Sequence, residues 1–281
     1  ASPANRGMAS SAFDFLRAAG SAMKGRHLED VCNIDKGRKP LGTGSFGTVW
    51  RATMKSDGAV VAVKTLDKRK MKDMHVPESL VLNEVALMQE CSGQVGFVMM
   101  YDFINTSSAY YLVMEFCDGG TLEDATKDGA QHLGERQVVR LMEQVFQGIA
   151  YLHGRSICHR DIKPQNAMML GRASSETVSV KLGDFGIAAR LQPSRLLTDK
   201  VGTPAFMAPE MHLLPDRSRG YDLKVDMWAA GAVMVFLLAH EYPFVDNSGR
   251  LMRDQLLRGD LPIWDTHSFS ALFQAVQEVA G

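Results

Sequence analysis

The chain of 281 residues is 46% hydrophobic, which is enough to bury a sizeable core, and it is longer than one average domain. Its 31 Lys and Arg residues nearly balance its 32 Asp and Glu residues, so the net charge is -1 and no cationic field draws nucleic acid or an acidic membrane toward it. We therefore expect one large domain or two lobes, and no nucleic-acid partner.

Cysteine spacing and the longest apolar run predict the cellular location of the protein and whether it spans a membrane. Four cysteines lie far apart with no CxxC pair, which disfavours a zinc site or a disulfide framework and favours an intracellular, cytoplasmic location. The longest apolar run, residues 227–239, is shorter than the roughly 20 residues of a membrane-spanning helix. We expect this run to form a buried core helix, and we expect no transmembrane segment.

Residues 1–30 are expected to form an extension before the main domain. Residues 1–7 are typical of a cloning remnant, with Met8 as the candidate native start. Apolar residues at near-helical spacing over 11–30 predict a short amphipathic helix that packs on its own domain. Membrane attachment through a longer native N-terminus stays open as an alternative.

The first part of the main domain has the pattern of strands with one helix. Residues 39–65 contain two β-rich segments and a turn at residues 56–58, which predicts a hairpin with a glycine-rich tip. Segments 97–103 and 110–116 predict a second hairpin. Between the hairpins, Pro77 and Glu78 open a helix over 77–90 whose predicted buried face consists of Leu80, Val81, Val85 and Met88.

After Gly120 the pattern changes to helices, beginning with one over residues 136–153. No internal repeat or low-complexity tract is present. The expected fold class is therefore α+β, with a small β-rich N-lobe that carries one main helix and a larger, mainly helical C-lobe.

The glycine-rich tip is a candidate phosphate site. Gly42, Gly44 and Gly47 form GxGxxG, in which missing side chains let backbone amides approach phosphate oxygens. The motif alone is weak, and an ordinary flexible hairpin tip explains it about equally well. Because the glycines join two strands rather than a strand and a helix, a dinucleotide-binding fold is excluded.

Two charged residues near this tip are candidate partners. Lys64 ends the strand segment AVVAVK, where its charge could reach the phosphates of a bound nucleotide. Glu84 lies among apolar neighbours on the predicted helix and could orient Lys64. The alternatives are a solvated lysine and an exposed helix glutamate.

The segment HRDIKPQN, residues 159–166, is the strongest chemical signal. Asp161 could accept the proton of a substrate hydroxyl, Lys163 could neutralise a transferring phosphoryl group, and Asn166 could bind a metal ion. Asp184, in KLGDFG, supplies a hard oxygen ligand suited to Mg²⁺. These side chains together predict phosphoryl transfer.

In this order, and followed by the segment VGTPAFMAPE, the motifs resemble the catalytic domain of eukaryotic protein kinases over about residues 39–281. The resemblance implies a kinase domain over 31–281, with an N-lobe at 31–114, a hinge at 115–121 and a C-lobe at 122–281 that is truncated at its end. It also implies ATP with Mg²⁺, for which Mn²⁺ could substitute, and protein substrates with Ser or Thr acceptors.

The resemblance assigns roles to individual residues. Asp161 would be the catalytic base, Lys64 would pair with Glu84 and the phosphates, and Asn166 and Asp184 would hold two metal ions. Lys163 with Thr203 matches the serine/threonine rather than the tyrosine pattern. The nucleotide would contact Leu41, Gly42, Gly44, Ser45, Phe46, Gly47, Val49, Ala62, Lys64, Met114, Glu115, Cys117 and Met168.

Further features are similar to the calcium-dependent, calmodulin-like-domain kinases. These are the long polar loop between Asn166 and Asp184, the DLPIW sequence within 256–268, and the acidic residue Asp199. No calcium-binding loop motif occurs in the sequence, so a calcium-binding regulatory module in cis is expected outside this chain. The alternatives are a kinase of the NIMA-related type and, as another class, a pseudokinase scaffold.

Regulation and substrate choice complete these expectations. We expect Asp199 to pair with Arg160 or Arg190 and to hold the activation segment without phosphorylation. The alternative is a solvated Asp199 with Thr198 as the phosphosite. Kinases of this group often select basic residues through acids at two positions that here read Thr121 and Gln165, so a strong basic preference is not expected, although three nearby acids could compensate: Asp118, Glu123 and Asp124.

Overall fold

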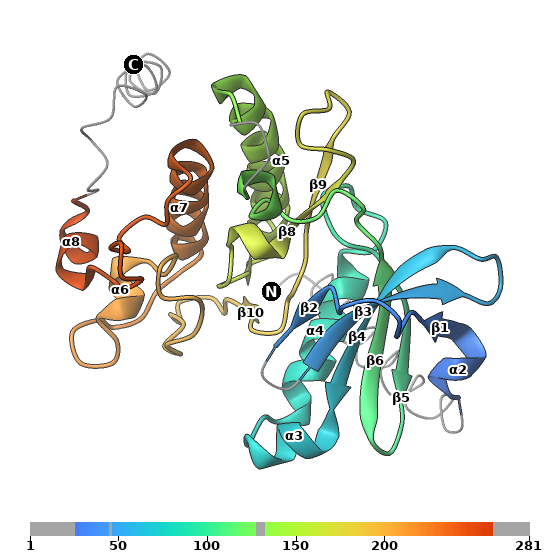
Figure 1. The fold of residues 1–281 in the computed structure, drawn as a ribbon. Helices are drawn as coiled ribbons and strands as arrows, with labels where there is room; N and C mark the ends of the chain where they lie inside the picture. The colour runs from blue at the N-terminus through green and yellow to red at the C-terminus, as the bar shows by residue number, and fades with distance from the viewer. Residues whose placement is uncertain (1–25, 45–46, 128–132, 261–281) are drawn as a thin grey trace. The chain divides into compact units, whose positions relative to one another are not determined.

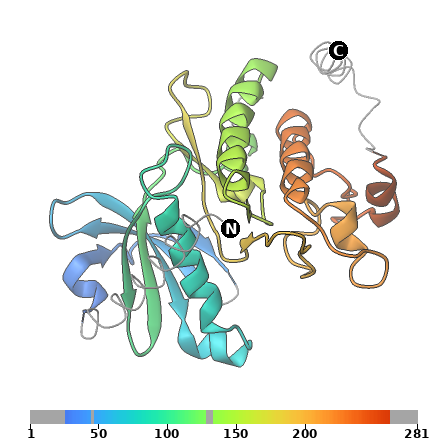
Figure 2. The same cartoon turned by 180° about the vertical axis from the view of Figure 1, so that it is seen from behind.

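The computed structural model describes residues 26–44, 47–127 and 133–260 (Figures 1 and 2). The chain divides into two compact units. The first unit contains the residues up to Thr121 together with Asn166–Ala188, and the second contains Leu122–Gln165 and the residues from Ala189 onward. Segment 166–188 therefore belongs with the first unit, whereas the sequence placed it inside a C-lobe of residues 122–281.

The first unit is built on an antiparallel sheet with the strand order β1-β3-β4-β6-β5, in which β2 also pairs with β3. Both predicted hairpins are confirmed, the first as β3 and β4 and the second as β5 and β6. The glycine-rich tip, predicted as the end of the first hairpin, instead joins β2 to β3, whereas the β3–β4 turn contains the predicted residues 56–58. The strands are β1 (Cys32–Ile34), β2 (Gly42–Thr43), β3 (Gly47–Met54), β4 (Val60–Asp67), β5 (Met100–Asn105) and β6 (Ala109–Glu115).

Strand register separates the two faces of this sheet. Directly paired residues in antiparallel strands point to the same face, so Val49 shares a face with Lys64, and Lys64 with Leu112. Helix α4 (Glu78–Glu90) covers this face (Figure 2). The helix matches the predicted one, except that Leu80, expected on its buried face, is 37% exposed.

The opposite face of the sheet is covered by the segment that precedes β1. Helix α2 (Leu28–Val31) buries Leu28 against an apolar cluster that includes Val61, Val63 and Val113. Arg26 adds an ion pair with Asp102 at 2.7 Å. Of the helix predicted within residues 11–30, most lies outside the described residues.

A third hairpin attaches to the first unit through its backbone. Strands β8 (Ala167–Leu170) and β9 (Ser179–Leu182) pair with each other. The amide of Gly119 donates to the carbonyl of Met169 at 2.9 Å, and the amide of Met169 donates to the carbonyl of Gly120 at 2.8 Å. A Cβ on Gly119 would lie 2.0 Å from the carbonyl oxygen of Gly171, so this close approach requires glycine. These contacts explain why segment 166–188 belongs with the first unit.

The second unit is mainly helical, as predicted. Helices α5 (Glu135–His153) and α7 (Lys224–Ala239) lie side by side (Figures 1 and 2). Helix α7 contains the apolar run predicted as a core helix, and most of its side chains are buried. The shorter elements are the 3₁₀ turn Asp124–Thr126, β7 (Ile157–Cys158), β10 (Ala189–Arg190), α6 (Pro209–His212) and α8 (Arg253–Arg258).

Among the described residues, no helix combines the length and apolar character that crossing a membrane requires. A sheet with one long helix and a mainly helical second unit together confirm the predicted α+β class.

Candidate active site

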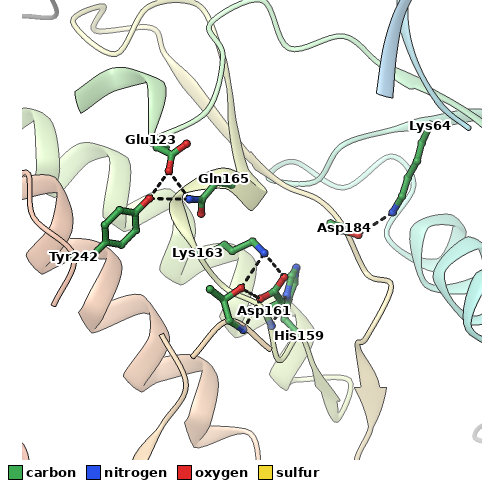
Figure 3. Close-up of polar contacts among 9 residues, drawn as sticks. Lys64, Glu123, His159, Asp161, Lys163, Gln165, Asp184 and Tyr242 are labelled. Atoms are coloured by element: carbon green, nitrogen blue, oxygen red, sulfur yellow. Dashed lines mark hydrogen bonds and ion pairs between the residues drawn. The ribbon is translucent and has the colours of Figure 1, made fainter. Parts of the chain in front are cut away.

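Lys64 lies between two carboxylates in the first unit. Its Nζ is 2.6 Å from Glu84 Oε1. The same Nζ is 2.9 Å from Asp184 Oδ1 (Figure 3). The Lys64 side chain is 19% exposed and that of Glu84 is 5% exposed. Burial by itself lowers the pKa of Lys64, but the two carboxylates outweigh burial and hold its pKa above the ordinary value. Lys64 is therefore a fixed positive charge at neutral pH, and its predicted partner Glu84 lies beside it.

The glycine-rich tip is closed by a hydrogen bond from the Gly44 amide to the Gly47 carbonyl at 2.8 Å. Among the atoms of the described residues, none lies within 4 Å of a Cβ built on Gly42, which leaves room for a ligand beside this backbone. A Cβ on Gly47 would lie 2.8 Å from the carbonyl oxygen of Thr65, which shows that Gly47 is needed for strand packing. Ser45 and Phe46 lie outside the described residues.

The residues predicted to surround the adenine belong to the same unit. Val49 and Ala62 lie on the sheet face that carries Lys64, and Met114 pairs directly with Ala62. Met168 lies on β8 and packs closely over Gly183. Leu41, next to the glycine-rich tip, is 49% exposed. The structure therefore brings this set to one unit.

The predicted hinge contains an ion pair that sequence reasoning missed. Glu115 binds Lys181 at 2.8 Å, and its amide donates to the carbonyl of Met99 at 2.8 Å. Burial raises the pKa of Cys117 to about 12, so this thiol stays protonated at neutral pH. No local pattern joins Lys181 to Glu115, because they are 66 residues apart in the sequence.

The candidate metal ligands lie near the start of the β8–β9 hairpin and just after it. The carbonyl of Asn166 accepts a hydrogen bond from the amide of Gly183 at 3.0 Å, which holds Asn166 close to the chain before Asp184. Asp184 has a left-handed φ of 62°, a strained conformation typical of functional sites. Within the described residues, no group of three or more His, Cys, Asp and Glu side chains could hold a metal ion by itself. Asn166 and Asp184 supply the oxygen donors that Mg²⁺ prefers.

In the second unit, Asp161 is held by two polar side chains (Figure 3). Its Oδ2 lies 2.7 Å from Lys163 Nζ, and its Oδ1 accepts hydrogen bonds from the Thr203 hydroxyl at 2.8 Å and the Thr203 amide at 3.1 Å. Lys163 Nζ also donates to Thr203 Oγ1 at 3.0 Å. The predicted set of Asp161, Lys163 and Thr203 therefore meets in space, although Thr203 is 42 residues away from Asp161.

A buried carboxylate supports the backbone before Asp161. Asp226 on α7 accepts hydrogen bonds from the amides of His159 and Arg160, both at 2.8 Å, and lies 2.9 Å from His153 Nε2. Its side chain is 1% exposed. Sequence reasoning missed Asp226, although one acid at the start of an apolar helix could have indicated a buried polar role.

The candidate regulatory residues form a small network. Arg160 donates to Asp199 Oδ2 at 3.0 Å and to the Tyr221 hydroxyl at 3.1 Å, and that hydroxyl donates to the carbonyl of Asp199 at 2.7 Å. Of the two arginines proposed for Asp199, the structure therefore pairs it with Arg160. Arg190 donates to the carbonyl of Arg155. Tyr221 was not predicted, and Thr198 is exposed.

At the end of segment 159–166, Gln165 and two other polar side chains bind one another (Figure 3). Gln165 Nε2 donates to Glu123 Oε1 and to the Tyr242 hydroxyl, and that hydroxyl donates to Glu123 Oε1. Lys127 Nζ lies 3.4 Å from the other oxygen of Glu123. We call Glu123, Gln165 and Tyr242 the Gln165 triad. Its carboxylate is already engaged by donors of this chain.

Comparison with known proteins shows that the protein kinase domain family matches residues 36–272 of this chain. The chain belongs to the protein kinase domain family. Membership implies that the domain uses ATP and a divalent metal ion. The two compact units are therefore parts of a kinase domain.

The relatives of this kinase domain place it among serine/threonine kinases. It is 32% identical to human calcium/calmodulin-dependent protein kinase type 1B over 250 residues, which cover 88% of this chain and 69% of the relative. It is 32% identical to calcium-dependent protein kinase 7 of Oryza sativa subsp. japonica and 29% identical to calcium-dependent protein kinase 5 of Plasmodium berghei. The chain spans 40% and 43% of those two proteins, which cover 80% and 92% of it.

These matches identify the chain as a serine/threonine protein kinase domain similar to the calcium/calmodulin-dependent and calcium-dependent kinases, as the sequence predicted. The kinases of this family act on protein substrates.

Proposed function

We propose that the kinase domain transfers the γ-phosphoryl group of ATP, with Mg²⁺, to Ser and Thr hydroxyls through the residues that sequence reasoning selected. The observation that carries this proposal is the position of Lys64, within 3 Å of both Glu84 and Asp184. A buried ammonium oriented by a carboxylate is suited to hold nucleotide phosphates. In this role Lys64 binds the α- and β-phosphates and Glu84 orients it.

Asp161 is the proposed base. Its carboxylate accepts the proton of the substrate hydroxyl, while Lys163 stabilises the charge on the transferring group. Thr203 fixes the orientation of Asp161 through two hydrogen bonds. Asn166 and Asp184 would hold the two metal ions, and Mn²⁺ could replace Mg²⁺ there. When bound, such an ion neutralises charge on the phosphate oxygens.

We further propose that Asp199 takes the place of an activating phosphate. Asp199 is 68% exposed, but its partner Arg160 is 7% exposed and its backbone amide is bound to Asp226. A charge at Asp199 therefore acts on the backbone next to Asp161. This role makes the kinase active without phosphorylation of Thr198.

For this role we expect Asp199→Ala to lower kcat by about fivefold, in keeping with roughly 1 kcal/mol for a largely exposed ion pair. Asp216→Ala, which removes an exposed acid from the loop after α6, is the matched control and should leave kcat unchanged. Mass spectrometry should find Thr198 unmodified in the active wild type. Unchanged activity of Asp199→Ala with phosphorylated Thr198 would refute the role.

The Gln165 triad is expected to weaken selection of basic substrates. Two of the acids that could compensate, Glu123 and Asp124, are already paired with Lys127, the second at 2.6 Å. The third, Asp118, accepts a hydrogen bond from the amide of Gly171 at 2.9 Å. We therefore propose that this kinase phosphorylates Ser and Thr without requiring arginine before the acceptor.

A peptide-library assay with wild type and Gln165→Glu tests this function and its specificity. Wild type should phosphorylate Ser and Thr peptides, but not Tyr peptides, with little dependence on arginine. Gln165→Glu adds a carboxylate and should lower the KM of arginine-containing peptides by about tenfold, equivalent to about 1.4 kcal/mol. Gln147→Glu is a matched control, because Gln147 on α5 also donates to a glutamate. A strong arginine requirement in wild type would contradict the proposal.

Calcium regulation is proposed on the names of the relatives. The kinases of Oryza sativa and Plasmodium berghei are called calcium-dependent, and the human relative is called calcium/calmodulin-dependent. We propose a calcium-binding regulatory module in cis, encoded outside this chain, and an intracellular location.

A further inference from the structure

We propose that Tyr110 is a positioning residue for catalysis, because its hydroxyl ties the first residue of helix α4 to the sheet and so fixes Glu84 against Lys64. This inference rests on the proposed role of the Lys64–Glu84 pair. Tyr110 is 3% exposed and lies on β6. Its hydroxyl donates to Glu78 Oε1.

Strand register places Tyr110 on the face of the sheet that helix α4 covers. Tyr110 pairs directly with Leu66, and Lys64 pairs with Leu112, so all four side chains point to the face covered by α4. The sheet therefore holds α4 through two polar contacts on neighbouring strands, Lys64 to Glu84 and Tyr110 to Glu78. The two glutamates are six residues apart, about 9 Å along a helix axis.

Two neighbouring side chains contact the ring of Tyr110. The Phe103 ring stacks on it at 5.9 Å between centroids, with 11° between the planes. Lys68 Nζ lies 4.1 Å from the ring centroid and donates to Asn105 Oδ1 at 2.6 Å. A ring held in this way aims its hydroxyl in one direction, so the hydroxyl can specify where α4 begins.

The hydrogen bond between Tyr110 and Glu78 is expected to persist across the neutral pH range. Burial and the neighbouring Glu78 carboxylate raise the pKa of Tyr110, so the phenol remains a donor throughout the neutral pH range. Glu78 is in the first turn of α4, where a negative charge also favours the helix. A third polar contact of α4 is made by Asn83, whose Nδ2 donates to the carbonyl of Ala188 at 2.9 Å.

The test compares variants that remove the hydroxyl or its acceptor. Tyr110→Phe keeps the ring and should lower kcat by about tenfold, near the lower end of the contribution of one hydrogen bond to a charged acceptor, without changing the peptide KM. Glu78→Ala should have the same effect, and the double variant should be no worse than either. Glu78→Gln keeps an acceptor oxygen and should retain most of the wild-type kcat. Tyr111→Phe is the matched control, since Tyr111 packs on the opposite face of β6.

A second readout does not depend on ATP or metal. Hydrogen exchange of the α4 amides should become faster in Tyr110→Phe and stay at the wild-type rate in Tyr111→Phe. Wild-type kcat and exchange in Tyr110→Phe would overturn the inference, as would additive losses in the double variant.

Glu84→Gln, measured alongside, separates this inference from the proposed function. If Glu84→Gln is impaired and Tyr110→Phe is not, only the positioning role fails. If Glu84→Gln keeps the wild-type kcat, the role of Glu84 fails and the positioning role fails with it.

Discussion

Replacing Asp161 by asparagine is expected to lower kcat by about 10² to 10⁴-fold, the contribution of a general base. The amide side chain can still accept a hydrogen bond from Thr203, but it cannot accept the proton of the substrate hydroxyl. Its amide group would also face the Lys163 ammonium, which lies 2.7 Å from the wild-type carboxylate. The loss should appear in kcat rather than in the KM for ATP.

Nucleotide binding provides the internal check on that experiment. Lys64, Glu84 and Asp184 belong to the other compact unit, so Asp161→Asn should bind ATP as wild type does. Asp260→Asn is a suitable control, because Asp260 forms an exposed ion pair with Arg258 at 2.6 Å. That control should keep its activity. Full activity in Asp161→Asn would remove Asp161 from the mechanism.

The largest effect on stability is expected at Asp226. Asp226→Ala removes the acceptor of two backbone amides and a histidine from a fully buried site, which should cost about 3 to 5 kcal/mol of unfolding free energy. Asp222→Ala, which removes an exposed acceptor from the amide of Lys224, should cost about 1 kcal/mol. Urea-induced unfolding measures both values. Equal stabilities of the two variants would contradict this account.

The contribution of Asp226 to the unfolding free energy should decrease at acidic pH. Burial alone would raise the pKa of Asp226, but hydrogen bonds from His153 and the amides of His159 and Arg160 hold its pKa below the ordinary value. A depressed pKa in the folded state gives stability that is present above the unfolded value of about 3.9 and is lost as pH falls through the folded pKa. The stability difference between wild type and Asp226→Ala should therefore shrink below about pH 4.

Local sequence patterns predicted most of the strands and helices and the charged residues Lys64 and Glu84. The alternating strands around Lys64, the apolar face of α4 and the long apolar run of α7 each have a periodicity that burial imposes. Leu80 shows where this reasoning stops. It has the spacing of the buried residues on α4, but it is 37% exposed, because periodicity does not report where neighbouring elements lie.

The contacts that fix the site were harder to predict because they join distant residues. Asp226 supports the backbone of His159 from 67 positions away, and Tyr221 reaches Asp199 from 22 positions away. The local sequence gives at most a weak signal of such side chains, as with the single acid at the start of the apolar helix α7. The sequence left Arg160 and Arg190 as alternative partners of Asp199, and only the fold shows that Arg160 is the one that contacts it.

The most direct test of the central claim is transfer of ³²P from ATP and Mg²⁺ to a Ser/Thr peptide by wild type and Asp184→Ala, with phosphoamino-acid analysis of the product. We predict label on serine and threonine with wild type, and loss of transfer in a folded Asp184→Ala variant. A wild-type chain that binds ATP but transfers no label, also when extended beyond Gly281, would contradict the mechanism and indicate a pseudokinase scaffold.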